Sequence, residues 1–222
     1  TNRGISGLEG FLDNELINNK KDISPLKLTL DSNLQYLIRE ELIKAQSDFN
    51  HIGSASILMD VENGEILSLI SLPDYDLNKR TSINHELYTN KITLGVYELG
   101  SVFKTFTVAA GLENNLISPN TIFKDLEKSL KCGKYKITEH DELPKNLSVE
   151  QILIRSSNIG SVRIAQKIGI EKYSNFLKSL GLLSKINFDL GEIGTPHSFK
   201  WGKCKLATVS YGHGITTTPL QL

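Results

Sequence analysis

One short stretch of the chain combines a nucleophile with a base at the spacing of one helical turn. Residues 97–104 read YELGSVFK, so Ser101 and Lys104 lie three positions apart. Residues at this spacing share one face of a helix, which lets the hydroxyl and the ammonium meet. A lysine can accept the serine's proton once burial and the positive end of a helix disfavour its charged form. Taken alone, Ser-x-x-Lys is common by chance, and a helix-capping serine followed by a solvated lysine is the simpler interpretation.

A second polar motif follows further along the chain. Residues 155–160 read RSSNIG and lie between two helical patterns. A Ser-x-Asn on such a connection can place the hydroxyl of Ser156 and the amide of Asn158 beside Ser101. By itself the motif is typical of a helix cap. The two motifs together, in this order and with their flanks, are far more specific than either one.

Two histidines offer other general bases. His213 lies in a Tyr-Gly-His-Gly sequence, and His140 precedes Asp141. Because Lys104 is available, a structural hydrogen bond is the preferred interpretation for each histidine. Glu98 could tune Lys104, although a surface or capping role fits it at least as well.

Composition excludes several classes of function. The 222 residues are 39% hydrophobic, enough for one large domain with its own core. The 25 basic and 25 acidic side chains cancel, so we expect no nucleic-acid partner. No apolar run reaches the roughly 18 residues of a membrane span, and any membrane anchor is expected outside this chain. Cys132 and Cys204 lack metal-ligand spacing, and two unpaired thiols are favoured over a single bridge. We expect neither a metal nor another cofactor.

Periodicity predicts a short sheet followed by a helical half. Asp31 and Ser32 can cap a helix with one apolar face, which suits packing on a sheet. Residues 55–61 and 65–71 are apolar runs joined by an Asn-Gly turn, a strong hairpin signal. Beyond the hairpin and a loop, the chain to its end is predicted to be helix and loop, which gives an α+β layout. The predicted helices there are residues 102–112, 148–155, 159–168 and 170–180.

These residues, taken together, resemble a known family. The chain is similar to the transpeptidase domain of the monofunctional, class B penicillin-binding proteins, and within them to the division-specific septal transpeptidases. The similar segments are the first-helix entry (28–35), the opening hairpin (59–73), the active-serine motif (97–104), the second motif (156–158) and the tail SYGHGITTTPLQL (210–222). The resemblance implies the α+β fold of penicillin-binding proteins and serine β-lactamases, with only the opening hairpin of its antiparallel sheet in this chain.

The resemblance also implies an acyl-transfer cycle. Ser101 would attack the D-Ala-D-Ala amide of a peptidoglycan stem peptide, and a neighbouring stem amine would take the acyl group. Lys104 would accept the Ser101 proton, Ser156 would relay a proton to the leaving amine, and Asn158 would hold the acyl donor's backbone. The backbone N–H of Ser101 would form half of an oxyanion hole. β-Lactams would acylate the same serine.

The chain departs from the family at the third motif. No Lys-Thr-Gly or Lys-Ser-Gly occurs in the 222 residues, so we expect the domain to be incomplete at its C-terminus. Residues 1–27 are interpreted as a connector from an upstream pedestal region, and residues 28–222 as the transpeptidase domain. The resemblance therefore implies that half of the oxyanion hole is missing from these residues.

The family implies partners and a location as well. These are stem peptides as substrate, β-lactams as covalent inhibitors, and a membrane glycosyltransferase with other division proteins. The catalytic domain would face the periplasm from the inner membrane. Two alternatives stay open: a class D-like β-lactamase or β-lactam sensor, and a non-catalytic division scaffold. Ser156-x-Asn158 argues against the first, because that group favours Ser-x-Val.

Overall fold

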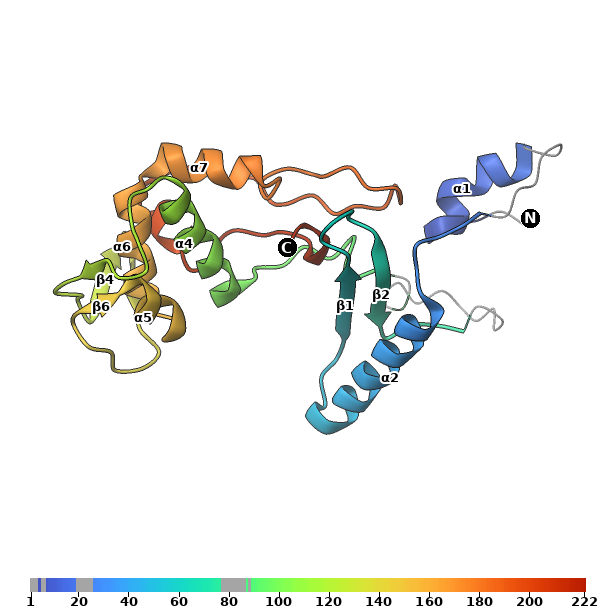
Figure 1. Ribbon diagram of the computed structural model, residues 1–222, viewed down its shortest axis with the longest axis horizontal. Helices are drawn as coiled ribbons and strands as arrows, with labels where there is room; N and C mark the ends of the chain where they lie inside the picture. Colours follow the sequence, from blue (N-terminus) through green and yellow to red (C-terminus); the bar gives the residue numbers. More distant parts are fainter. Residues whose placement is uncertain (1–3, 5–6, 19–25, 77–86, 88) are drawn as a thin grey trace. The chain divides into compact units, whose positions relative to one another are not determined.

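The computed structural model describes residues 4, 7–18, 26–76, 87 and 89–222 (Figure 1). Its contacts divide the chain into two compact units. We call residues 1–96, 185–195 and 218–222 the hairpin unit, and residues 97–184 and 196–217 the helical unit. Both predicted motifs fall within the helical unit.

The hairpin unit begins with two helices and one antiparallel pair of strands. Its elements are α1 (Gly7–Asn18), α2 (Ser32–Phe49), β1 (Ser54–Met59), β2 (Ile66–Leu72) and the short 3-10 helix η2 (Pro219–Gln221). Every second residue of β2 is buried, from Ile66 to Leu72, as expected for a strand with one face on a core. Among the described residues, β1 and β2 form a two-stranded sheet with no further partner. The predicted hairpin is therefore confirmed.

The turn of this hairpin differs from the expected tight Asn-Gly turn. Asp60 donates its N–H to the carbonyl of Glu65 at 2.9 Å, which closes a longer loop between the strands. Gly64 accounts for the Asn-Gly signal, because its φ of 78° lies in the left-handed region that glycine adopts without strain. A register shift between Leu58 and Met59 accompanies the longer loop.

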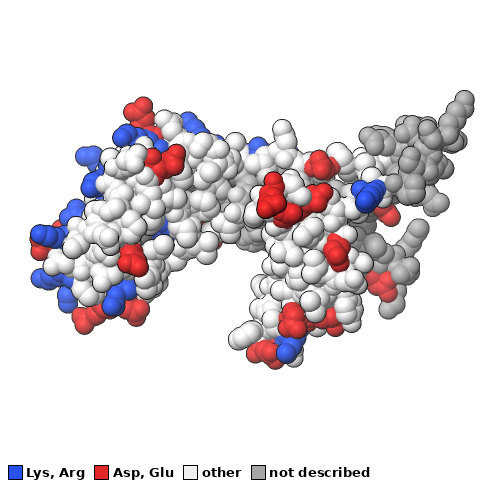
Figure 2. Space-filling view, in the orientation of Figure 1, with Lys and Arg blue, Asp and Glu red and all other residues white. Residues whose placement is uncertain are grey.

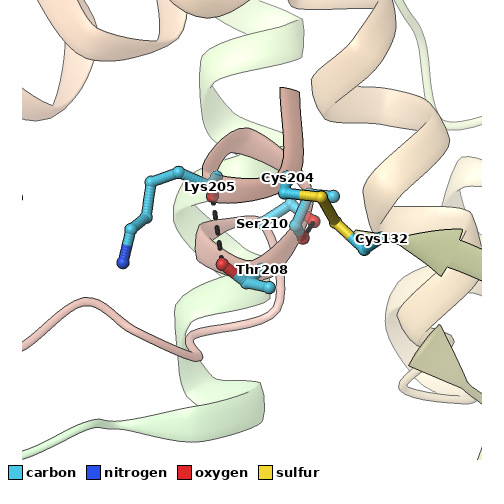
Figure 3. The surroundings of a disulfide bond; sticks show 6 residues. Cys132, Cys204, Lys205, Thr208 and Ser210 are labelled. Carbon is cyan, nitrogen blue, oxygen red and sulfur yellow. Dashed lines mark hydrogen bonds between the residues drawn. A yellow bond between two sulfur atoms is a disulfide. The ribbon is translucent and has the colours of Figure 1, made fainter. Parts of the chain in front are cut away.

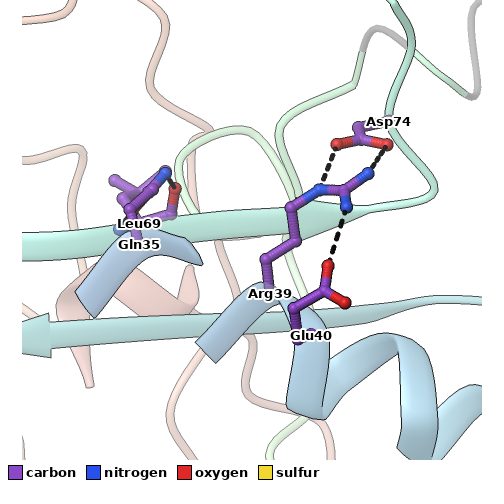
Figure 4. Close-up of polar contacts among 5 residues, drawn as sticks. All are labelled: Gln35, Arg39, Glu40, Leu69 and Asp74. Carbon is purple, nitrogen blue, oxygen red and sulfur yellow. Dashed lines mark hydrogen bonds and ion pairs between the residues drawn. The ribbon is translucent and has the colours of Figure 1, made fainter. Parts of the chain in front are cut away.

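Helix α2 packs against β2, as its apolar face predicted, but it is not deeply buried. Asp31 caps it, since its carboxylate accepts the N–H groups of Asn33 and Leu34. Gln35 reaches the strand and donates to the carbonyl of Leu69 at 2.8 Å (Figure 4). No residue of α2 is fully buried, and its apolar residues Leu37 and Ile43 are exposed.

An ion pair joins the middle of α2 to the chain just after β2. The guanidinium of Arg39 donates to both carboxylate oxygens of Asp74, at 3.1 and 3.2 Å (Figure 4). Glu40 lies 3.5 Å from the same guanidinium. All three side chains are substantially exposed, so the pair fixes geometry more than it stabilises the fold.

The helical unit contains most of the helices. They are the 3-10 helix η1 (Gly100–Phe103), α4 (Lys104–Glu113), α5 (Val149–Ile154), α6 (Asn158–Ile168), α7 (Ile170–Ser179) and α8 (Lys203–Val209). The four predicted helices are present with small differences at their ends, and α8 was not predicted.

The prediction that this half holds no strands was wrong. It contains two short antiparallel pairs, β3 (Ile122–Phe123) with β6 (Leu147–Ser148) and β4 (Ser129–Cys132) with β5 (Tyr135–Thr138). Strands of two to four residues are too short for a period of two to appear in the sequence.

The core of the helical unit lies between α4, α6, α7 and α8, which cluster in Figure 1. Helix α6 supplies an apolar stripe that includes the fully buried Ile159 and Ile164. A buried polar contact fixes α4: the hydroxyl of Thr107 donates to the carbonyl of Ser210 at 2.7 Å. It must therefore accept from the hydroxyl of Tyr173, also at 2.7 Å, because a hydroxyl has one proton. Burial raises the pKa of Tyr173, which keeps the phenol a donor.

Cys132 and Cys204 form a disulfide, so the expectation of two unpaired thiols was wrong (Figure 3). The bond joins the end of β4 to α8 across 72 residues, with the Cα atoms 5.3 Å apart. That distance is within the normal range for bridged cysteines. The sequence could not reveal the pair, because only the folded chain brings β4 to α8.

Charged side chains of both signs lie close together on one face of the helical unit (Figure 2). Figure 2 shows Lys and Arg beside Asp and Glu over the part of the helical unit that carries α5, β4 and β6. This agrees with the equal numbers of basic and acidic residues in the sequence. Within the described ranges, no helix has both the length and the apolar character needed to cross a membrane.

Candidate active site

Ser101 lies on the first turn of a continuous helical segment. Gly100, with a φ of 57°, turns the backbone into η1, and α4 follows directly. The side chain of Ser101 is exposed, as a nucleophile requires. Its N–H is among the first of the helical segment, so it has no acceptor within the helix. The predicted helix-start position of Ser101 is confirmed.

The chain just before Ser101 is held by residues 211–217. Tyr97 and Thr217 exchange backbone hydrogen bonds of 2.9 and 3.0 Å. Gly212 packs so closely that a Cβ there would overlap the carbonyl oxygen of Gly100. The tail that resembles the family's pre-third-motif segment therefore supports the loop that leads into Ser101.

Glu98 and His213 form further contacts between the loop before Ser101 and residues 211–217. Glu98 accepts the N–H of Gly214 at 2.9 Å, and its other oxygen lies 3.0 Å from Nδ1 of His213. These contacts agree with the structural roles preferred from the sequence. The pKa of Lys104 is shifted by burial and, in the opposite direction, by the charge of Glu139.

Lys104 is buried and is bonded to Ser156. Its side chain has 1% relative exposure. The Nζ atom donates to the hydroxyl of Ser156 at 2.9 Å and to the carbonyl oxygen of the same residue. Desolvation by burial lowers the pKa of Lys104 to about 8, while the charge of Glu139 opposes that shift. A neutral amine is thus accessible near neutral pH, which a proton acceptor needs.

Ser156 adopts a backbone conformation that is uncommon for a residue with a side chain. It lies between α5 and α6 with a φ of 53°. Its N–H donates to the carbonyl of Leu153, which closes the end of α5. Such a conformation persists only where surrounding contacts hold it, and it often occurs at functional sites. Here it presents both the carbonyl and the hydroxyl of Ser156 to Lys104.

Ser157 and Asn158 start α6. Ser157 caps the helix, since its hydroxyl accepts the N–H of Gly160 at 2.8 Å. The side-chain amide of Asn158 donates to the carbonyl of Thr138 at 2.9 Å, and the residue is 7% exposed. The helix-capping serine is therefore the middle residue of the predicted Ser-x-Asn motif.

Glu139 also contacts the second motif, although the sequence did not single it out. Its carboxylate accepts hydrogen bonds from Ser157 Oγ at 2.6 Å, from the N–H of Asn158 at 2.7 Å and from the N–H of Ile159 at 3.0 Å. It follows β5 directly and lies at the N-terminus of α6, where negative charge is favoured. Its neighbour His140, one of the alternative bases, is exposed. The sequence signal was only an acidic residue after a short strand.

The structure thus joins Lys104, Ser156 and Asn158 through a connected set of contacts. Lys104 follows Ser101 on the same helical segment, and its N–H donates to the Ser101 carbonyl. Within the described residues, the Ser101 hydroxyl has no hydrogen bond to Lys104 or Ser156. The chemistry that this arrangement can perform is attack by a serine whose proton passes to a desolvated lysine.

Comparison with known proteins agrees with this geometry. Residues 54–222 match the family model for the penicillin-binding protein transpeptidase domain. The chain belongs to this family. The family relationship confirms the fold class expected from the sequence, since the solved relatives also share the architecture. The transpeptidase domain of penicillin-binding protein 3 from Burkholderia pseudomallei superimposes with a TM-score of 0.75 at 26% identity, over 89% of this chain and 57% of that one.

Two of the curated relatives are named as peptidoglycan D,D-transpeptidases. The chain is 32% identical to "Probable peptidoglycan D,D-transpeptidase FtsI" of Caulobacter vibrioides, over 99% of this chain and 38% of that protein. It is 30% identical to peptidoglycan D,D-transpeptidase FtsI of Escherichia coli K12, over 89% of this chain and 34% of that protein. The chain therefore spans little more than a third of the length of each of these two relatives.

Proposed function

We propose that the protein containing this chain is a septal peptidoglycan D,D-transpeptidase that uses Ser101 as its nucleophile. The single observation that supports this most directly is the buried Lys104 bonded to Ser156, one helical turn after an exposed serine. A solvated lysine, the simpler interpretation of Ser-x-x-Lys, does not fit that burial.

The proposed reaction has two acyl transfers. The Ser101 oxygen attacks the carbonyl carbon between the two terminal D-alanines, and its proton passes to neutral Lys104. The C–N bond then breaks, and D-alanine leaves with a proton delivered from Lys104 through the hydroxyl of Ser156. The amine of a neighbouring stem attacks the resulting ester, loses a proton to Lys104, and releases Ser101 with its proton restored. Each step keeps the base within one hydrogen bond of its relay.

Two further roles complete the proposal. The N–H of Ser101 stabilises the oxyanion, because a helix-start N–H lacks an internal acceptor. Asn158 holds the backbone of the acyl donor through the part of its amide not used by Thr138. β-Lactams are proposed to acylate Ser101 as covalent inhibitors of the same step.

The proposed location is the periplasmic face of the inner membrane, with a membrane glycosyltransferase and other division proteins as partners. The Cys132–Cys204 disulfide supports this location, because disulfides persist in oxidising compartments such as the bacterial periplasm. We keep the proposal that residues 1–27 connect an upstream pedestal region to a transpeptidase domain that begins at residue 28.

Labelling with a fluorescent penicillin tests the function. The full-length protein should form a covalent adduct on Ser101, identified by peptide mass spectrometry, that persists for many minutes. Ser101→Ala should abolish the adduct and leave the thermal transition nearly unchanged, because the side chain is exposed. Adduct formation in Ser101→Ala would refute the assignment. Rapid loss of the wild-type adduct would favour a β-lactamase, and its absence would favour a scaffold.

A further inference from the structure

The hydrogen bonds of Glu139 are concentrated on the turn that carries the second motif. Oε1 accepts from Ser157 Oγ and from the N–H of Ile159, and Oε2 accepts from the N–H of Asn158. Hydrogen bonds to a carboxylate are stronger than those between neutral groups. One side chain therefore fixes three consecutive residues directly after Ser156.

The conformation of Ser156 needs such support. A φ of 53° is strained for a residue other than glycine, so the turn would relax if its contacts were lost. Relaxation would move the carbonyl and hydroxyl of Ser156, which are the two groups bonded to Lys104. Asn158 is tied to the same segment by its bond to the carbonyl of Thr138.

Glu139 also lines a cavity of about 680 Å³, together with His140, Asp141 and Glu142. Both of its carboxylate oxygens are nevertheless engaged by α6 and its cap. The contacts thus point to a role directed toward the Ser156 turn and not toward a ligand in the cavity.

We propose that Glu139 is a positioning residue for the acylation of Ser101, which holds the Ser156-Ser157-Asn158 turn against Lys104. This inference rests on the proposed function. Glu139 does not touch the reacting atoms. It acts through the turn, and through its charge on the ammonium of Lys104. That charge raises the pKa of Lys104 against the larger effect of burial, and among the described residues it is the one charged group with such an effect.

The test compares acylation of three variants of the full-length protein by fluorescent penicillin from pH 6 to pH 9. Glu139→Gln keeps the shape but places an NH2 group where one backbone N–H now donates. Its rate at the high-pH plateau should fall at least about tenfold, as expected for a lost charged hydrogen bond. The midpoint of its pH–rate profile should move to lower pH, because the charge that favours the ammonium is gone. Glu139→Asp should lower the plateau but keep the wild-type midpoint, since the charge remains.

Glu142→Gln is the matched control. It removes the same charge from the same loop, but this side chain is 94% exposed and pairs with Lys128. Its plateau and midpoint should equal those of the wild type. Rates are expressed per competent molecule by active-site titration, so that partial misfolding of a variant lowers the amplitude and not the rate.

The outcomes are distinct. A wild-type plateau and midpoint in Glu139→Gln, or an equal change in Glu142→Gln, would overturn the inference alone. A lowered plateau with no change of midpoint would limit Glu139 to holding the turn and overturn its electrostatic part. If wild-type Ser101 is not acylated at all, the proposed function fails and the inference fails with it.

Discussion

The pH dependence of acylation is the sharpest test of Lys104 as a base. The pKa of its ammonium falls from the ordinary value of 10.5 to about 8 on burial. With that value, about a tenth of the molecules carry a neutral amine at pH 7, against about three in ten thousand for a solvated lysine. Burial therefore raises the population of the reactive form about three-hundredfold.

The rate of acylation should follow this population. Because the neutral form is the one that accepts a proton, the rate should rise with pH, about fiftyfold between pH 6 and pH 8, and then level off. The assay is the second-order rate constant for a fluorescent penicillin, measured by stopped flow or quenched gels at constant ionic strength. A thermal melt at each pH checks that the protein stays folded.

A second variant separates a base from a mere positive charge. Lys104→Arg keeps the charge but has no usable neutral form, since a guanidinium stays protonated. Its acylation should be at least about a hundredfold slower than the wild type and should not rise across this range. A wild-type rate that is flat from pH 6 to pH 9, or a Lys104→Arg rate close to wild type, would refute the reasoning.

Three further predictions concern the relay, the helix start and the disulfide. Ser156→Ala removes the hydroxyl that lies 2.9 Å from Lys104 Nζ but keeps the carbonyl. The acylation rate should fall about a hundredfold while the melting temperature changes little. An unchanged acylation rate would exclude the relay. Gly160→Ala introduces a Cβ within 2.8 Å of atoms of Ile152 and Ser157. The free energy of unfolding, measured by denaturant titration, should therefore fall by about 1–3 kcal/mol. An unchanged free energy of unfolding would show that the start of α6 is more loosely packed than described. Cys204→Ser, or a reductant, opens a bridge spanning 72 residues, whose closure contributes about 4 kcal/mol in the chain-entropy model, so the melting temperature should fall by about 10 °C. An identical melting temperature with and without reductant would argue against the bond.

The sequence by itself determined the features that depend on neighbouring residues. The spacing of Ser101 and Lys104 places them on one helical face, and Asp31 caps α2 as its residue type predicted. The β1–β2 hairpin and the cores of α4 to α7 follow from local periodicity. The two motifs, in this order and together with the other matching segments, indicated the family that the comparison of residues 54–222 confirmed.

Tertiary structure decided everything that joins distant parts of the chain. Lys104 and Ser156 are 52 residues apart in the sequence. No local sequence pattern predicts the burial of Lys104 or its lowered pKa. The Cys132–Cys204 bond, the short β3–β6 and β4–β5 pairs and the support of Gly100 by Gly212 arise in the same way. Glu139 is the clearest case. Its carboxylate becomes part of the site only because the end of β5 lies beside the N-terminus of α6. The hydrogen bonds that hold the carboxylate there form only in the folded chain.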